Sequence, residues 1–138
     1  MNKFIKMLLA CLCITSTACG QKEYTDLDTD AFEAYISQHK TDGVQIIDVR
    51  TPGEYAEGTI PGAVLLDVKD DAFAAKGEAM LDKGKPVAVF CRSGRRSAAA
   101  ASILTKKGFK NVANLIGGFL AWQKAEKTVV TPDAGTGM

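Results

Sequence analysis

One cysteine lies where its thiol would be reactive. Cys91 follows an apolar run of strand length, residues 86–90, and precedes Arg92-Ser93-Gly94-Arg95-Arg96-Ser97 and an alanine-rich stretch, residues 98–104. This order predicts a buried strand, a tight loop and the first turn of a helix, so that backbone N–H groups point at the sulfur. Together with the three guanidinium groups, they would lower the thiol pKa and favour the nucleophilic thiolate.

The residues after the cysteine divide into candidate roles. Arg92, Arg95 and Arg96 can orient an oxyanion with bidentate geometry, although arginines also form plain solvated surfaces. The hydroxyls of Ser93 and Ser97 either bond the sulfur or cap the helix, and capping is favoured for Ser97. We therefore predict that Cys91 is the catalytic residue and that the rest of the loop binds substrate: Arg92, Ser93, Gly94, Arg95, Arg96 and Ser97.

The alternative is a structural cysteine buried at the end of a core strand, which is the common fate of a free thiol. Such a thiol requires neither the glycine nor the arginines that follow Cys91. The two interpretations differ in one structural respect. A reactive sulfur must be faced by loop N–H groups, and either burial of the sulfur beneath side chains or N–H groups turned away from it would overturn this interpretation.

The N-terminus has the pattern of an export signal. Lys3 and Lys6 precede an apolar run, residues 7–14, and small residues stand before Cys19, as in a signal peptide. The run is too short to span a bilayer, which takes ~20 residues. Residues 1–18 are therefore predicted to be a signal peptide. Cys19 resembles the lipidated cysteine of a bacterial lipoprotein, and this is favoured over plain secretion after Ala18.

Cleavage at this point leaves Cys91 as the sole free thiol if Cys19 carries lipid. A lone thiol outside the cytoplasm indicates reactivity rather than a disulfide framework. The leader carries two of the 17 basic residues and none of the 16 acidic ones, so the mature chain has a net charge of about −1. Nothing in this balance points to nucleic acid. His39 is the only histidine, so a metal site would lack ligands.

The rest of the chain predicts one α/β domain, residues 24–127, after a tether at 19–23 and before a flexible tail at 128–138. Short apolar runs alternate with helical segments, which is typical of a mainly parallel sheet. Strands are expected at 24–27, 44–49, 63–66, 86–90 and 111–115, and helices at 28–39, 71–81, 97–107 and 118–126, with one helical turn at 54–57. Asp48 and Arg50 then lie with Cys91 at the carboxyl edge of the sheet, where ligands bind, and a structural ion pair is favoured for them.

Four segments together resemble the rhodanese-like domain across roughly residues 24–127. They are Asp48-Val49-Arg50 with Glu54-Tyr55; Gly58-Thr59-Ile60-Pro61-Gly62-Ala63; the loop from Cys91 to Ser97; and Gly117-Gly118 with Trp122. Thr59 departs from the family, which usually has histidine there. The resemblance implies a five-stranded parallel sheet with helices on both faces.

In that family the loop cysteine takes a sulfane sulfur from a donor and holds it as a persulfide. The resemblance therefore implies a sulfurtransferase without a cofactor that moves sulfur from thiosulfate or a similar donor to cyanide or a thiol. Two alternatives remain: a sulfur relay or thiol-redox partner of a thioredoxin-like protein in the envelope, and a noncatalytic binding module. Tyrosine phosphatase activity is disfavoured, because the four residues between Cys91 and Arg96 make the loop one residue shorter than in those enzymes. The expected location is the periplasm or cell envelope, with the lipid on Cys19 as membrane anchor.

Overall fold

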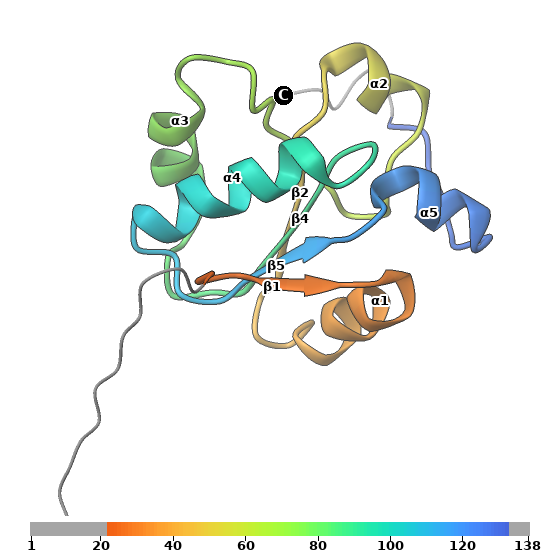
Figure 1. The fold of residues 1–138 in the computed structure, drawn as a ribbon, viewed down its shortest axis with the longest axis horizontal. Helices are drawn as coiled ribbons and strands as arrows, with labels where there is room; N and C mark the ends of the chain where they lie inside the picture. Colours follow the sequence, from red (N-terminus) through yellow and green to blue (C-terminus); the bar gives the residue numbers. More distant parts are fainter. Residues whose placement is uncertain (1–21, 133–138) are drawn as a thin grey trace, which may run out of the picture.

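The computed structural model describes residues 22–132, which form one α/β unit (Figure 1). The predicted signal peptide, Cys19 and the last six residues of the chain lie outside this range. No helix within the described range is long and apolar enough to cross a membrane.

Five parallel strands form a single sheet at the centre of the unit. They are β1 (Thr25–Leu27), β2 (Gln45–Asp48), β3 (Val64–Leu65), β4 (Val87–Phe90) and β5 (Val112–Leu115). Their order across the sheet is β1-β5-β4-β2-β3, and every neighbouring pair is parallel. The predicted five-stranded sheet is confirmed, with β4 in its middle.

Helices cover both faces of the sheet, as Figure 1 shows. They are α1 (Thr29–Gln38), α2 (Pro52–Glu57), α3 (Phe73–Met80), α4 (Arg95–Lys106) and α5 (Gly118–Lys124). The two cores on either side of the sheet show how the faces are shared. Phe73 of α3 and Leu104 of α4 pack in one core, whereas Phe32 of α1 and Trp122 of α5 pack in the other.

Strand β4 supplies both cores because successive side chains of a strand point to opposite faces. Val87 and Val89 pack with α3 and α4, while Ala88 and Phe90 pack with α1 and α5. All four side chains are fully buried. A central strand buried on both faces is held firmly in position, so the backbone that leads directly into Cys91 is fixed by packing on two sides.

A buried ion pair lies at the end of β2. Arg50 donates through Nε to Asp48 Oδ1 at 2.9 Å and through Nη2 to Asp48 Oδ2 at 2.7 Å. Asp48 is fully buried and Arg50 is 4% exposed. Both side chains form further hydrogen bonds with nearby groups. Thr59 donates to Asp48 Oδ2 at 2.8 Å, and Arg50 donates to the Gly58 carbonyl at 2.6 Å. The pair therefore joins the end of β2 to the segment after α2.

The segment after α5 differs from the flexible tail that the sequence suggests. Thr59 and Val130 form an antiparallel bridge, and the Trp122 indole N–H donates to the Thr128 carbonyl at 2.8 Å. Residues 128–132 thus pass along the Gly58–Thr59 segment. The backbone hydrogen bonds of this bridge outweigh the loop-forming composition of the segment.

Removal of the Asp48 charge tests the buried pair. We expect Asp48→Asn to lower the free energy of unfolding by about 3–5 kcal/mol, because it leaves a buried guanidinium without its counter-ion. Denaturant unfolding followed by circular dichroism measures the change. The matched control is Asp42→Ala, whose carboxylate contacts His39 and is 57% exposed; its midpoint should stay close to that of the wild type. Equal stability of Asp48→Asn and the wild type would contradict this role.

Candidate active site

Cys91 directly follows β4, and its loop ends where α4 begins. Val49, which follows β2, donates its backbone N–H to the Phe90 carbonyl at 3.0 Å, so the ends of β2 and β4 lie side by side. The residue before α4 is Gly94, with φ at +101° in the left-handed region. A side chain there would be strained, and its Cβ would lie 3.2 Å from the Leu115 carbonyl oxygen. Glycine thus permits the tight turn around the sulfur.

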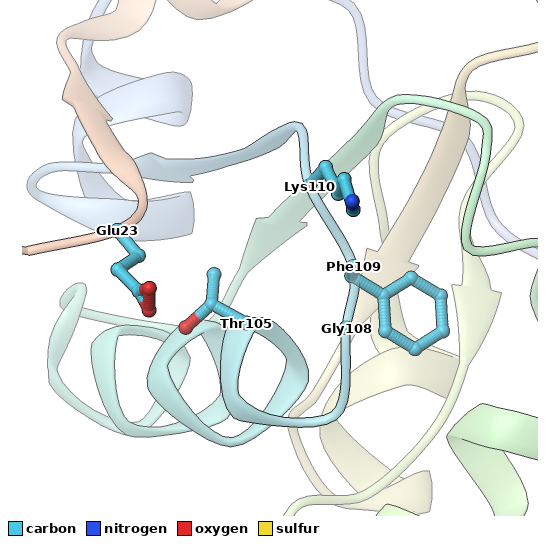
Figure 2. Close-up of a pocket in the computed structure, with 5 residues that line it drawn as sticks. All are labelled: Glu23, Thr105, Gly108, Phe109 and Lys110. Atoms are coloured by element: carbon cyan, nitrogen blue, oxygen red, sulfur yellow. The ribbon is translucent and has the colours of Figure 1, made fainter.

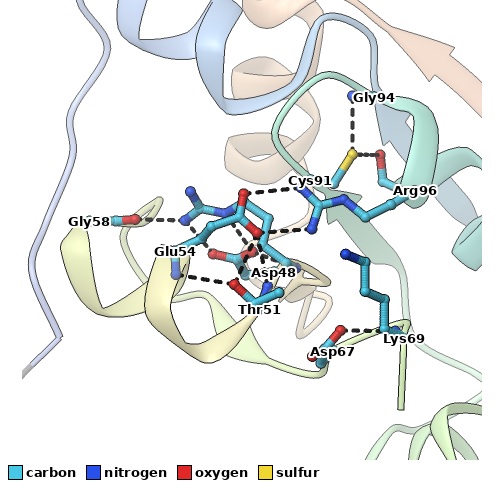
Figure 3. Close-up of polar contacts among 11 residues, drawn as sticks. Asp48, Thr51, Glu54, Gly58, Asp67, Lys69, Cys91, Gly94 and Arg96 are labelled. Atoms are coloured by element: carbon cyan, nitrogen blue, oxygen red, sulfur yellow. Dashed lines mark hydrogen bonds and ion pairs between the residues drawn. The ribbon is translucent and has the colours of Figure 1, made fainter. Parts of the chain in front are cut away.

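The Cys91 sulfur accepts hydrogen bonds from its own loop (Figure 3). The Gly94 backbone N–H donates to Sγ at 3.1 Å, and the Ser97 hydroxyl donates at 3.4 Å. Burial by itself raises the pKa of the thiol. Hydrogen bonds from the Ser97 hydroxyl and from the backbone N–H groups of Ser97, Gly94 and Ser93 outweigh that effect, so the net pKa is lowered. These donors stabilise the thiolate.

The Cys91 side chain is completely buried. Cys91 is 0% exposed and belongs to the buried core that α3 and α4 cover. The N–H groups face the sulfur, as the reactive interpretation requires. The complete burial of Cys91 is the outcome that this interpretation excluded for a reactive thiol, so the structure meets one of its two conditions and not the other. Arg92, Ser93 and Arg95 are exposed, so the enclosing loop borders solvent on its outer side. In this conformation of the loop, Cys91 has no exposed surface.

The expected role of Ser97 as a helix cap is wrong. Helix α4 begins at Arg95, two residues earlier than the sequence suggested, and Gly94 occupies the cap position without a side-chain hydrogen bond. The left-handed backbone of Gly94 lets the helix start at once, which places Ser97 inside the first turn. Its hydroxyl is then free to donate to the sulfur, the other role open to it.

The three arginines do not lie in equivalent surroundings. Arg96 forms a bidentate pair with Glu54, with Nη1 to Oε1 at 2.9 Å and Nη2 to Oε2 at 3.0 Å. Arg92 and Arg95 are exposed and form no ion pair within residues 22–132. Within residues 22–132, these two guanidinium groups therefore have no carboxylate partner, whereas Arg96 shares its charge with Glu54.

Glu54 was not among the predicted site residues. Within α2 it completes a capping box with Thr51, in which the Thr51 N–H donates to Glu54 Oε1 at 3.1 Å and the Glu54 N–H donates to Thr51 Oγ1 at 3.3 Å. The sequence Thr51-Pro52-Gly53-Glu54 carries this signal. Its contact with Arg96 spans 42 positions and has no local signature.

Helix α5 fixes the loop from the other side. Phe119 donates its backbone N–H to the Cys91 carbonyl at 2.8 Å, and Leu120 donates to the Arg92 carbonyl at 3.1 Å. Gly118 makes this approach possible, since a Cβ there would lie 2.4 Å from the Arg92 oxygen. The Gly117-Gly118 pair was expected to permit a tight turn; the structure adds a close backbone contact with Cys91 and Arg92.

Two pockets flank the loop. One of about 200 Å³ touches Arg50, Glu54, Arg92 and Phe119 among its lining residues. The other, of about 270 Å³, is bordered by Ser93 and Gly94. A third pocket of about 290 Å³, shown in Figure 2, is lined by Glu23, Thr105, Gly108, Phe109 and Lys110 and includes no residue of the loop. Within residues 22–132, no group of three or more His, Cys, Asp or Glu side chains is arranged to hold a metal ion.

Comparison with known proteins gives this fold and site a family. The rhodanese-like domain model matches residues 29–125, and the chain belongs to this family. A sulfurtransferase from Allochromatium vinosum is 32% identical over 108 residues, which cover 78% of this chain and 96% of that protein. The thiosulfate sulfurtransferase GlpE from Pseudoalteromonas translucida is 37% identical over 84 residues, covering 59% of this chain and 75% of that protein. Such relatives support sulfurtransferase activity in general.

Solved structures agree with the fold. A rhodanese-like domain protein from Staphylococcus aureus superposes with a TM-score of 0.60 at 32% identity, covering 71% of this chain and 90% of that one. A rhodanese-like domain from Anabaena gives a TM-score of 0.68 at 22% identity, covering 78% and 79%. The match to Anabaena concerns the fold alone.

The hydrogen bonds to the sulfur predict a low thiol pKa. We expect the pH midpoint for alkylation of Cys91 by iodoacetamide to lie below that of free cysteine, about 8.5, because the loop N–H groups favour the thiolate. Mass spectrometry measures the rate of alkylation at each pH. The midpoint comes from the relative rates, so it does not depend on how slow burial makes the reaction. Ser97→Ala, which removes one donor, should raise it. A wild-type midpoint at or above that of free cysteine would refute the role of the loop.

The close contact at Gly118 predicts strong sensitivity to a side chain. We expect Gly118→Ala to lower the melting temperature by roughly 10 °C or more, because its Cβ would collide with backbone and its φ of +61° is strained. Gly53→Ala is the matched control, since nothing lies within 4 Å of its Cβ position. Differential scanning calorimetry compares the two. Similar melting temperatures for both variants would show that α5 does not need this approach.

Proposed function

We propose that this chain is a sulfurtransferase that carries sulfur as a persulfide on Cys91. It takes a sulfane sulfur from a donor such as thiosulfate and passes it to a thiophilic acceptor, either cyanide or a thiol. The hydrogen bond from the Gly94 N–H to Cys91 Sγ carries the proposal. A sulfur that only fills a core does not need such a donor, whereas a thiolate and a persulfide anion both do.

The first half of the reaction is a displacement at sulfur. The Cys91 thiolate attacks the outer sulfur of thiosulfate, a new S–S bond forms, and the bond to the sulfonate group breaks. Sulfite leaves with the electron pair of that bond. The persulfide keeps its negative charge on the outer sulfur, where the loop N–H groups can stabilise it with little reorganisation.

The second half regenerates the thiolate. Cyanide attacks the outer sulfur, takes it as thiocyanate and leaves the electron pair on Cys91 Sγ. A thiol acceptor reacts as its thiolate and becomes a persulfide itself. No external oxidant or reductant is needed in either case, which agrees with a reaction that uses no cofactor.

The charges of the loop suit an anionic donor. Arg92 and Arg95 are exposed and unpaired within the described range, so they are the groups that would attract thiosulfate and orient its oxygens. Arg96 is held by Glu54 and contributes less net charge. Because Cys91 is enclosed, productive binding also includes a shift of the exposed Arg92–Ser93 segment.

We further propose export to the bacterial cell envelope with a lipid on Cys19. Support comes from the basic and apolar leader and the small residues before Cys19. In that setting a thioredoxin-like protein is a candidate acceptor for sulfur. The intact Cys91 loop argues against a noncatalytic module.

Replacement of the proposed nucleophile tests the reaction. We expect Cys91→Ser to abolish thiocyanate formation from thiosulfate and cyanide while the fold is retained, because serine cannot hold the transferred sulfur at this position. Colorimetric thiocyanate assay and circular dichroism measure the two properties. Cys19→Ser is the control cysteine variant; it should keep turnover but leave the membrane fraction. Turnover by Cys91→Ser would reject the mechanism, and membrane retention of Cys19→Ser would reject the lipid anchor.

A further inference from the structure

We propose that Glu54 is a positioning residue for sulfur transfer, acting through Arg96 on the Cys91 site. Its carboxylate holds the Arg96 guanidinium in one orientation beside the sulfur and offsets part of its charge. The inference deepens the proposed function and rests on it for the identity of the reaction. Neither Glu54 nor Arg96 forms or breaks a bond in the persulfide reaction itself.

The ion pair is built to hold one geometry. Both Glu54 oxygens are used, each by a different nitrogen of Arg96, and such bidentate pairing fixes the plane of the guanidinium. Glu54 itself is held by the capping box, in which its Oε1 also accepts from the Thr51 N–H and hydroxyl, both at 3.1 Å. The carboxylate is therefore anchored to the start of α2 before it meets Arg96.

The pair lies next to the reactive sulfur. Arg96 immediately precedes Ser97, whose hydroxyl donates to Sγ, and Figure 3 shows its guanidinium directed from α4 toward the Glu54 carboxylate. The charge of Cys91 is among the groups that raise the pKa of Arg96. A bidentate pair through Nη1 and Nη2 leaves further N–H groups of Arg96 unused by Glu54. Those Arg96 N–H groups can donate hydrogen bonds to a sulfur donor such as thiosulfate as it approaches Cys91. Glu54 sets the direction in which they point.

The charge states support a permanent pair. The Arg96 hydrogen bonds lower the pKa of Glu54 to about 2, so Glu54 stays ionised at every pH at which the thiol titrates. Hydrogen bonding and charge from Glu54 raise the pKa of Arg96, and negative charges of Cys91 and Asp67 add to this. The charge of Cys91 therefore acts on Arg96 through space, and Glu54 offsets part of the Arg96 charge.

The charged groups around the sulfur come from several elements. They are Arg92 of the loop, Arg95 and Arg96 of α4, Glu54 of α2, Asp67 and Lys69 after β3, and the Asp48–Arg50 pair at the end of β2. From α5, the Phe119 and Leu120 N–H groups donate to the Cys91 and Arg92 carbonyls. Neutralising Glu54 changes the net charge around the sulfur in a known direction. One negative charge is lost, an arginine cation is freed, and the thiolate becomes more favourable.

Glu54→Gln is the decisive variant because it preserves size and retains one acceptor oxygen for the cap. We expect the alkylation midpoint of Cys91 to fall by roughly half a pH unit. We also expect kcat for thiosulfate to fall roughly tenfold, since the guanidinium loses its alignment, while KM does not rise. A merely structural role would loosen the loop, weaken its hydrogen bonds and move the midpoint upward.

Two further variants sharpen the experiment. Glu23→Gln should match the wild type in midpoint and kcat, because Glu23 lines the pocket that includes no loop residue and forms no ion pair within residues 22–132. Glu54→Gln combined with Arg96→Gln should cost little more in kcat than Arg96→Gln alone, because Glu54 acts through Arg96. Additive losses in the double variant would overturn the proposal.

The readouts also separate this inference from the proposed function. Alkylation requires no sulfur transfer, so the midpoints test Glu54 even if the wild type forms no persulfide, an outcome that would reject the function alone. A midpoint in Glu54→Gln that is unchanged or raised would reject the positioning role, whatever the activity of the wild type.

Discussion

The site depends on a hydrogen bond that the fold forces on a buried sulfur. β4 is packed on both faces, and its end delivers Cys91 into a loop whose N–H groups turn inward, with the Gly94 N–H at 3.1 Å from Sγ. Burial alone would make the thiol neutral and inert. Because donors surround the sulfur, the same enclosure favours the anion. Packing of the central strand and activation of the thiol thus follow from one arrangement.

Two carboxylate–guanidinium pairs brace this arrangement in different ways. Asp48 and Arg50 are almost completely buried and join the end of β2 to the Gly58–Thr59 segment. Glu54 and Arg96 are about one quarter exposed and join α2 to the first turn of α4. A buried pair is costly to break, whereas a partly exposed pair adjusts at smaller cost. The first accordingly suits a fixed frame, and the second suits the positioning role that we propose for Glu54.

Much of the fold could be predicted from the sequence because strands and loops leave local patterns of apolar and turn-forming residues. Apolar runs of strand length indicated β2, β3 and β4, the shorter segments at 24–27 and 111–115 indicated β1 and β5, and the segment from Cys91 to Ser97 located the loop. The start of α4 was missed by two residues because the left-handed backbone of Gly94, visible only in three dimensions, decides where the helix begins. That error led to the wrong role for Ser97. Glu54 was missed since its partner lies 42 positions away, and the ordered residues 128–132 were missed since their bridge to Thr59 is also non-local.

The central claim is that Cys91 stores a transferable sulfur atom, and intact-mass spectrometry after exposure to thiosulfate tests it most directly. The account predicts that the chain gains the mass of one sulfur, that peptide mapping places it on Cys91, and that cyanide removes it. A chain whose mass is unchanged by thiosulfate at a pH where Cys91 is alkylated would contradict the account, because the thiolate would then be present without taking up sulfur.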